Sequence, residues 1–241
     1  MSTPSISDFK GPTYLDDYKA AWLAWEASPE GIESKKREQE RKQEEQRRFD
    51  RRLDEEIESL VDRMPVPSRA KDAAKGKIEQ TEAVKASLGS TDFLVLSGGP
   101  GCGKTVAAVA WVIAYVRDKA LWSKDICDQP RFSAGGPIWV TAARLARWER
   151  YDEDAMRKLL STPRLVIDDL GGEYLDKGGF YASLLDEIVN ERQSEGKPTI
   201  MTTNLNAEAF KVRYGERIAD RIREGGRFVE CGSASLRKAA P

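Results

Sequence analysis

The stretch FLVLSGGPGCGKTVAAVAWV, residues 93–112, decides the fold. An apolar run leads into a turn of four glycines and one proline, and Lys104 and Thr105 then open a second apolar run. This order predicts a strand, a tight loop and the first turns of a helix. The glycines suit a loop whose backbone N–H groups all point inward, because glycine adopts the required dihedral angles most easily.

The loop matches the pattern G-x-x-x-x-G-K-[ST] through Gly98, Gly99, Pro100, Gly101, Cys102, Gly103, Lys104 and Thr105. Inward N–H groups and the N-terminus of the following helix attract phosphate oxygens. Lys104 is predicted to reach the β- and γ-phosphates and the Thr105 hydroxyl to bind Mg²⁺, whereas Cys102 is a small filler rather than a nucleophile. The chain has no N-K-x-D segment to read guanine, so ATP and Mg²⁺ are the expected cofactors.

Composition excludes several other kinds of chemistry. The chain of 241 residues has no histidine and three widely spaced cysteines, which excludes histidine-based catalysis and the paired cysteines of a zinc finger. A net charge of −1 gives no overall basic field to attract nucleic acid. No apolar run approaches the roughly 20 residues that cross a bilayer, and the first residues lack an apolar leader, so we expect a cytoplasmic protein that does not enter membranes.

The chain divides by composition near residue 65. Residues 33–58 alternate charges, with pairs such as Glu38/Lys42 and Glu44/Arg48 at helical spacing, and Tyr18, Trp22 and Trp25 precede them. This part is either a solvated helical spacer or a partner-binding helix, and its aromatic residues either form a docking site or pack back on the main domain. We expect a helical partner-binding region at 1–65, a linker and first helix at 66–90, and the main domain at 91–241.

The main domain alternates short apolar strands with helices. Strands are predicted at 93–97, 138–141, 165–168, 199–203 and 227–231, with helices at 104–118, 142–149, 153–161, 179–194 and 207–223. Short apolar strands separated by helices predict an α/β fold, in which a parallel five-stranded sheet is covered by helices on both faces.

Acidic residues follow the third predicted strand in the segment RLVIDDLGGEYLD. Asp168 stands where a phosphate-loop fold places the acid associated with Mg²⁺. Asp169 can orient or deprotonate an attacking water, which points to hydrolysis, and Glu173 is a second, less favoured candidate base. Asn204, after the next strand, either holds that water near the γ-phosphate or caps the next helix.

Arginines are frequent near the end of the chain. Helical arginines usually solvate a surface, but hydrolysis in phosphate-loop enzymes often needs an arginine on the γ-phosphate, supplied in cis or by a neighbour. Arg217 follows Gly215 and Glu216 at an expected helix start, from which it can project across a subunit interface.

The segments LSGGPGCGKT, WVTAARLARW, LVIDDLGGE, MTTNL, YGERIADRI and GSASLR occur in this order over about residues 90–237. In this order the sequence resembles the AAA+ ATPases, and more narrowly the DnaC-type helicase loaders and the IstB-type transposition ATPases. The resemblance implies a P-loop NTPase without a C-terminal helical lid that assembles with ATP into a homo-oligomeric ring or spiral. It also implies Asp168 and Asp169 as Walker B acids, Asn204 as sensor 1, Arg217 as an arginine finger in trans, and Arg237 as a nucleotide contact.

In the loaders a segment after the Walker B acids faces the ring interior and touches single-stranded DNA. The corresponding segment here is LDKGGFYAS, in which Lys177 offers charge and Phe180 or Tyr181 a stacking face. The alternative is a helix-capping loop with core aromatics. By analogy, residues 1–65 would bind the replicative DNA helicase.

Three functions follow from these patterns. The leading one is an ATPase, converting ATP and water to ADP and phosphate, that loads a replicative helicase and assembles around single-stranded DNA. The second is an IstB-like transposition regulator that binds duplex DNA and recruits a transposase. The third is an ATP-gated protein adaptor with little turnover.

Overall fold

The structure is a computed structural model of the chain and describes residues 5, 14–76, 78, 80–90, 92–124, 136–147, 153–174, 179–232 and 235–236. The chain forms two compact units, Met1–Asp54 and Glu55–Pro241. The division falls within helix α2 (Pro29–Arg63), which contrasts with the boundary at residue 65 that composition suggested. No helix among the described residues is long and apolar enough to cross a membrane.

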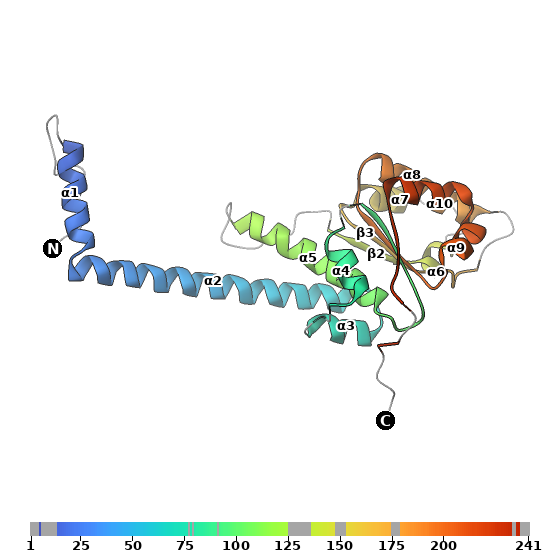
Figure 1. Cartoon of the computed structure of the whole chain (residues 1–241), viewed down its shortest axis with the longest axis horizontal. Coiled ribbons are helices and arrows are strands. Elements are labelled where there is room, and N and C mark those ends of the chain that lie inside the picture. Colours follow the sequence, from blue (N-terminus) through green and yellow to red (C-terminus); the bar gives the residue numbers. More distant parts are fainter. Residues whose placement is uncertain are drawn as a thin grey trace, which may run out of the picture. The chain divides into compact units, whose positions relative to one another are not determined.

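The first unit consists of α1 (Tyr14–Glu26) and most of α2, which meet at a sharp corner (Figure 1). The predicted aromatic stripe forms along α1, where the ring of Trp22 lies 6.1 Å from that of Tyr18 and 5.3 Å from that of Trp25. At the corner, the Ser28 hydroxyl donates to the Trp25 carbonyl oxygen at 2.7 Å. An ion pair of 3.0 Å between Lys35 and Glu26 further ties the two helices together.

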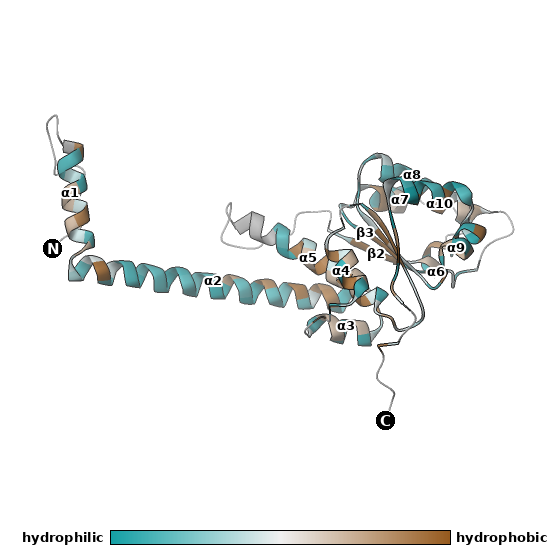
Figure 2. Cartoon of the chain, in the orientation of Figure 1, coloured by the Kyte–Doolittle hydropathy of each residue, from teal (hydrophilic) through white to brown (hydrophobic). Residues whose placement is uncertain are grey.

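Charged residues cover most of α2, as its hydrophilic colour in Figure 2 shows. The predicted pairs form, with Lys42 at 2.7 Å from Glu38 and Arg48 at 3.0 Å from Glu44. Exposed pairs of this kind contribute about 0.3–0.5 kcal/mol each, so they support the helix without fixing it to anything else.

The second unit contains a parallel five-stranded sheet, as the sequence predicts, and its strand order is β2-β3-β4-β1-β5. Its strands are β1 (Phe93–Ser97), β2 (Ile138–Thr141), β3 (Leu165–Leu170), β4 (Thr199–Thr203) and β5 (Gly226–Glu230). The central strands β1 and β4 are buried along their whole length, as expected for strands of a parallel sheet that helices cover on both faces.

Helices cover both faces of this sheet (Figure 1). On one face α3 (Ser68–Lys75) and α4 (Glu82–Leu88) pack against α5 (Lys104–Lys124). On the other, α8 (Phe180–Ser194) packs between α7 (Glu153–Ser161) and α10 (Glu216–Gly225). The remaining helices are α6 (Ala142–Leu145) and α9 (Ala207–Tyr214).

Two segments differ from their sequence-based expectation. Residues 66–90 are not mainly a linker, because Ala70, Ala74, Ala83 and Val84 on α3 and α4 are buried in the second unit. The single helix expected at 207–223 is two helices, because Gly215 has φ 94° and ψ 157°, a conformation that cannot continue a helix.

Candidate nucleotide-binding site

The predicted site residues meet at one edge of the sheet. In a parallel sheet the carboxyl ends of all strands share an edge, and ligands of α/β proteins bind there. The loop after β1, the acids at the end of β3 and the polar residues after β4 therefore come together, since β3, β4 and β1 are neighbours.

The glycine loop takes the backbone path expected of a phosphate cradle. Gly98, Gly101 and Gly103 have φ values of 150°, 89° and 95°. A Cβ atom on Gly98 would lie 2.7 Å from the Gly232 oxygen and 2.9 Å from Cys102 Sγ, so no side chain fits there. Cys102 itself is buried under the loop, in the filler position that the sequence suggested.

Lys104 begins α5 and turns its ammonium back across the loop. Nζ donates to the carbonyl oxygens of Gly98 at 2.7 Å and Gly99 at 3.0 Å, and to Asn204 Oδ1 at 3.0 Å. These acceptors are uncharged, so they hold the ammonium at the loop without neutralising its charge. Asn204 does not cap the next helix, because the cap of α9 is Asn206, which accepts from the Ala209 N–H at 2.8 Å.

Asp168 is buried at the end of β3 and receives two hydroxyl groups. Thr202 donates to Asp168 Oδ1 at 2.5 Å, and Thr105 donates to the same oxygen at 3.4 Å. Burial raises the pKa of the Asp168 carboxyl, the hydrogen bond from Thr202 opposes that rise, and the charge of Asp169 adds to it. A bound cation would reverse the shift by favouring the carboxylate.

The donor set fits Mg²⁺. This ion takes oxygen ligands and is usually bound by one or two carboxylates together with substrate phosphates and water. Thr105 and Asp168 present a hydroxyl and a carboxylate oxygen side by side. Among the described residues no cluster of three or more His, Cys, Asp or Glu side chains could hold a metal alone.

Asp169 differs from its neighbour in both backbone and exposure. With φ 63° it is the only non-glycine residue of positive φ in the part of the chain that the structure describes. It lies at a register shift between Ile167 and Leu170, and its side chain is exposed beside the buried Asp168. Its N–H donates to Thr202 Oγ1 at 2.9 Å. Strained residues of this kind concentrate at functional sites.

Glu173 is not placed to act as a base. Its side chain is fully buried and accepts hydrogen bonds from Arg213, from the Tyr214 hydroxyl at 2.6 Å and from the Gly171 N–H at 2.8 Å. A carboxylate so surrounded by donors has no open position toward a reacting water, so the less favoured interpretation of Glu173 fails.

Arg217 lies in the first turn of α10, and 72% of its side chain is exposed. Its Nε is 3.5 Å from Asp186 Oδ2, while Arg221 holds the other oxygen of that carboxylate at 3.1 Å. An exposed guanidinium with one long ion pair can change partners at low cost.

The residues predicted to touch DNA fare differently. Lys177 lies outside the described residues. Arg237, which was predicted to contact the nucleotide rather than DNA, lies outside them as well. Tyr181 is only 2% exposed and belongs to the core, so it cannot offer a stacking face, and Phe180 packs partly against the same core. The exposed aromatic of this region is Tyr174, at 80%, which the sequence did not single out.

Comparison with known proteins finds relatives of this chain. No family model matches the chain. It is 28% identical to the replicative helicase loader DnaC of Escherichia coli K12 over 145 residues, 57% of this chain and 52% of that protein. It is 30% identical to YdaV, an uncharacterized protein of the same strain, over 166 residues, 66% of this chain and 61% of YdaV. The chain is thus similar in sequence to the replicative helicase loaders named DnaC.

The chain spans about half the length of the curated DnaC proteins that it matches. A putative primosome component from Streptococcus pyogenes has the same fold, with a TM-score of 0.51 and 17% identity over 72% of this chain and 93% of that one.

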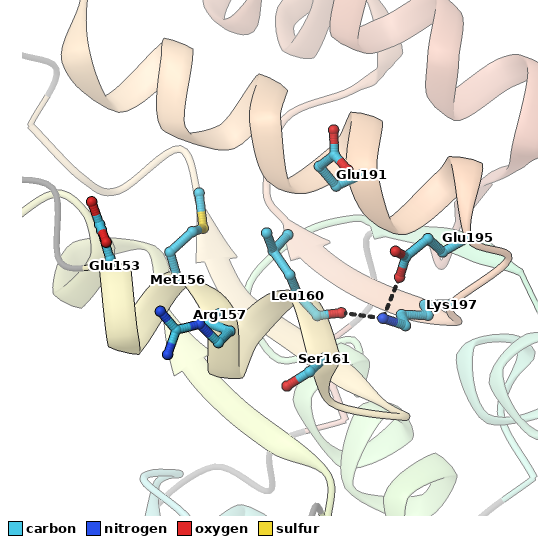
Figure 3. A pocket seen from close by; sticks show the side chains of 8 residues that line it. All are labelled: Glu153, Met156, Arg157, Leu160, Ser161, Glu191, Glu195 and Lys197. Carbon is cyan, nitrogen blue, oxygen red and sulfur yellow. Dashed lines mark hydrogen bonds and ion pairs between the residues drawn. The ribbon is translucent and has the colours of Figure 1, made fainter.

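A separate pocket of about 480 Å³ lies between α7 and the end of α8 in the second unit (Figure 3). Leu160 and Ser161 precede β3, and Lys197 precedes β4, so this pocket is at the amino-terminal edge of the sheet, opposite the phosphate loop. Lys197 bonds there to Glu195 and to the Leu160 carbonyl oxygen. The pocket is therefore not part of the nucleotide site.

Proposed function

We propose that the chain is an ATP-hydrolysing helicase loader that assembles with ATP around single-stranded DNA. The observation that carries this is the meeting of Lys104, Asp168 and Asn204 at the carboxyl edge of the sheet. Lys104 Nζ donates to Asn204 Oδ1 at 3.0 Å, and the Thr105 hydroxyl donates to Asp168 Oδ1 at 3.4 Å. A triphosphate lying on the loop would meet the ammonium and the N-terminus of α5 together.

Each residue has a separate part in the proposed reaction. Thr105 and Asp168 would hold Mg²⁺, which neutralises charge on the β- and γ-phosphates when bound. Asp169, exposed beside them, would orient the attacking water and accept its proton. Asn204 would position that water, and by its bond to Lys104 it would also keep the ammonium in place.

Arg217 is the residue that makes the proposed hydrolysis depend on assembly. Its side chain is 72% exposed on α10, so it can serve the γ-phosphate of a neighbouring subunit. Hydrolysis would then require at least two subunits, and a homo-oligomer would be the active form.

The DNA and protein contacts are proposed on separate surfaces. Tyr174 replaces Tyr181 as the stacking residue for single-stranded DNA because its ring is exposed, and Lys177 beyond it would meet the phosphates. In the first unit Leu15, Leu23 and Ile32 are exposed by 49%, 64% and 59%, which supports this unit as the helicase-binding part.

The test is the ATPase rate of the purified chain alone, with single-stranded DNA and with duplex DNA. Single strands should give the larger stimulation. A larger stimulation by duplex would favour the transposition regulator instead. A rate that neither DNA raises, and that Asp169→Asn does not lower, would favour the ATP-gated adaptor.

A further inference from the structure

Glu173 carries a buried charge for which the phosphate site has no use. Its side chain is 0% exposed, and it follows Asp169 by four residues. Burying a carboxylate costs free energy unless charges and hydrogen bonds compensate it, and a well-packed apolar pair at the same place is often as stable. The partners that compensate Glu173 therefore indicate which segments this carboxylate holds together.

Both oxygens of the carboxylate are engaged. Oε1 accepts from Nε and Nη2 of Arg213, both at 3.1 Å, and from the Tyr214 hydroxyl at 2.6 Å. Oε2 accepts from the Gly171 N–H at 2.8 Å. Arg213 Nη2 also donates to the backbone oxygen of Glu173, so the guanidinium grips both side chain and main chain.

These partners belong to two functional segments. Gly171 directly follows β3, two residues after Asp169, and its φ of 104° turns the chain back toward Glu173. Arg213 and Tyr214 are the last residues of α9, and after Gly215 the helix α10 begins with Glu216 and Arg217. The Glu173 carboxylate thus joins the segment that follows Asp168 and Asp169 to the corner between α9 and α10.

The acids have their own tether, whereas Glu173 bonds directly to the last two residues of α9, next to the corner. Thr202 holds both Asp168 and the Asp169 N–H from β4. In α10, Ile218 and Ile222 pack in the core, but the connection at Gly215 has a conformation that only glycine tolerates well. Loss of Glu173 should therefore disturb the corner more than the acids.

We infer that Glu173 is a positioning residue that holds the α9–α10 corner, and with it Arg217, against the end of β3. The inference rests on the proposed function, in which Arg217 serves the nucleotide of the next subunit. Through these hydrogen bonds, the segment next to the Walker B acids of one subunit sets the position of Arg217 in that same subunit. Arg217 is the arginine finger that this subunit lends to its neighbour.

Hydrogen exchange tests the positioning without any activity. In Glu173→Gln and Arg213→Met, amides of residues 214–222 should exchange at least about tenfold faster, while those of β1 and β4 keep their rates. Tyr214→Phe keeps a ring whose centroid lies 4.7 Å from that of Phe210 and loses only the hydroxyl hydrogen bond, so it should give a smaller rise in the same peptide. Unchanged exchange at the corner in all three variants would overturn the inference.

Arg192→Lys is the matched control. Arg192 is a buried guanidinium in the same unit, and it bonds to the carbonyl oxygens of Leu159, Thr162 and Pro198 rather than to the corner. It should lower stability without raising exchange at residues 214–222. If it raises that exchange as much as Glu173→Gln does, the effect is general loosening and the inference fails.

Mixed assemblies test the consequence for the finger. Asp169→Asn subunits lend a finger but cannot hydrolyse, and Arg217→Ala subunits have intact acids but no finger, so their mixture should regain ATPase activity. Adding Glu173→Gln to the Asp169→Asn subunits should cut the regained rate by at least about tenfold. Adding it to the Arg217→Ala subunits should change that rate by less than about twofold.

The outcomes separate the two claims. If the parent mixture regains nothing, the trans finger of the proposed function fails, and the role of Glu173 toward it fails as well. If the parent mixture is active but Glu173→Gln lowers the rate equally from either side, or from neither, the proposed function stands and only the inference is overturned.

Discussion

At the scale of single residues, the Thr202 hydroxyl organises the acids. It donates to Asp168 at 2.5 Å and accepts from the Asp169 N–H at 2.9 Å, so one oxygen fixes one carboxylate and the strained backbone beside it. Lys104 is held by Asn204, which directly follows the same strand. In the proposed function, the acids and Lys104 would thus depend on different residues at the end of β4.

Thr202→Val should therefore separate the two steps. Valine keeps the shape of threonine but removes the hydroxyl that donates to Asp168, and it leaves the Asp169 N–H without its acceptor, a cost of about 1–3 kcal/mol. We expect kcat for ATP to fall about tenfold or more while nucleotide affinity changes little, and Thr202→Ser to restore most of the rate. Steady-state kinetics with direct binding measures both, and a wild-type kcat in Thr202→Val would remove Thr202 from the account.

The raised pKa of Asp168 predicts how stability depends on pH. In the window between its ordinary and its raised pKa the folded state holds more protons than the unfolded state, so stability falls as pH rises through that window. Without nucleotide, Asp168→Asn should raise the melting temperature at neutral pH, and this gain should vanish at pH values below the ordinary carboxyl pKa. Melting curves across pH check this, and a gain independent of pH would contradict it.

At the scale of elements, the break between α9 and α10 gives Arg217 its place in the first turn of a helix. A Cβ on Gly215 would meet nothing within 4 Å, so its conformation alone requires glycine. Gly215→Ala should lower the free energy of unfolding by about 1–3 kcal/mol. Gly179→Asn is the control, since φ 71° and ψ 14° suit asparagine. Denaturant unfolding compares them, and equal losses would count against this reading.

The sequence predicted the three inner strands β1, β3 and β4 well because the sheet buries almost all of their residues, whereas the edge strands β2 and β5 are only partly buried. It missed the break at Gly215 because an isolated glycine in a helical pattern is a weak signal. At the site, Lys104, Thr105 and Asp168 follow from local motifs, whereas Thr202 required the register of β4 beside β3. The Glu173–Arg213 pair joins residues 40 positions apart, and no local pattern reports such a contact.

Tyr181 shows a signal that was present in the sequence and was misjudged. Together with Leu184, Leu185 and Ile188 it recurs at helical spacing, which is the pattern of a core face. Tyr174 stands before that pattern begins, and the structure leaves it exposed.

At the scale of the whole molecule, the proposed function needs a DNA contact that the ATPase core can sense. Tyr174 is adjacent to Glu173, so a base stacked on its ring would lie next to the network that holds the α9–α10 corner. Tyr174→Ala should weaken binding of single-stranded DNA by about 1–3 kcal/mol. Tyr181→Phe, a change to a buried ring, should not, and equal effects of the two in a DNA titration would argue against stacking.

The most direct test of the central claim is the mass of the assembly on single-stranded DNA with and without ATP. Wild type and Asp169→Asn should form ATP-dependent oligomers, because binding drives assembly and hydrolysis follows it. Lys104→Ala, which loses the phosphate contact, should remain unassembled, whereas Lys197→Ala, at the opposite edge of the sheet, should assemble like wild type. Assembly that is the same without ATP, or that persists in Lys104→Ala, would contradict the account.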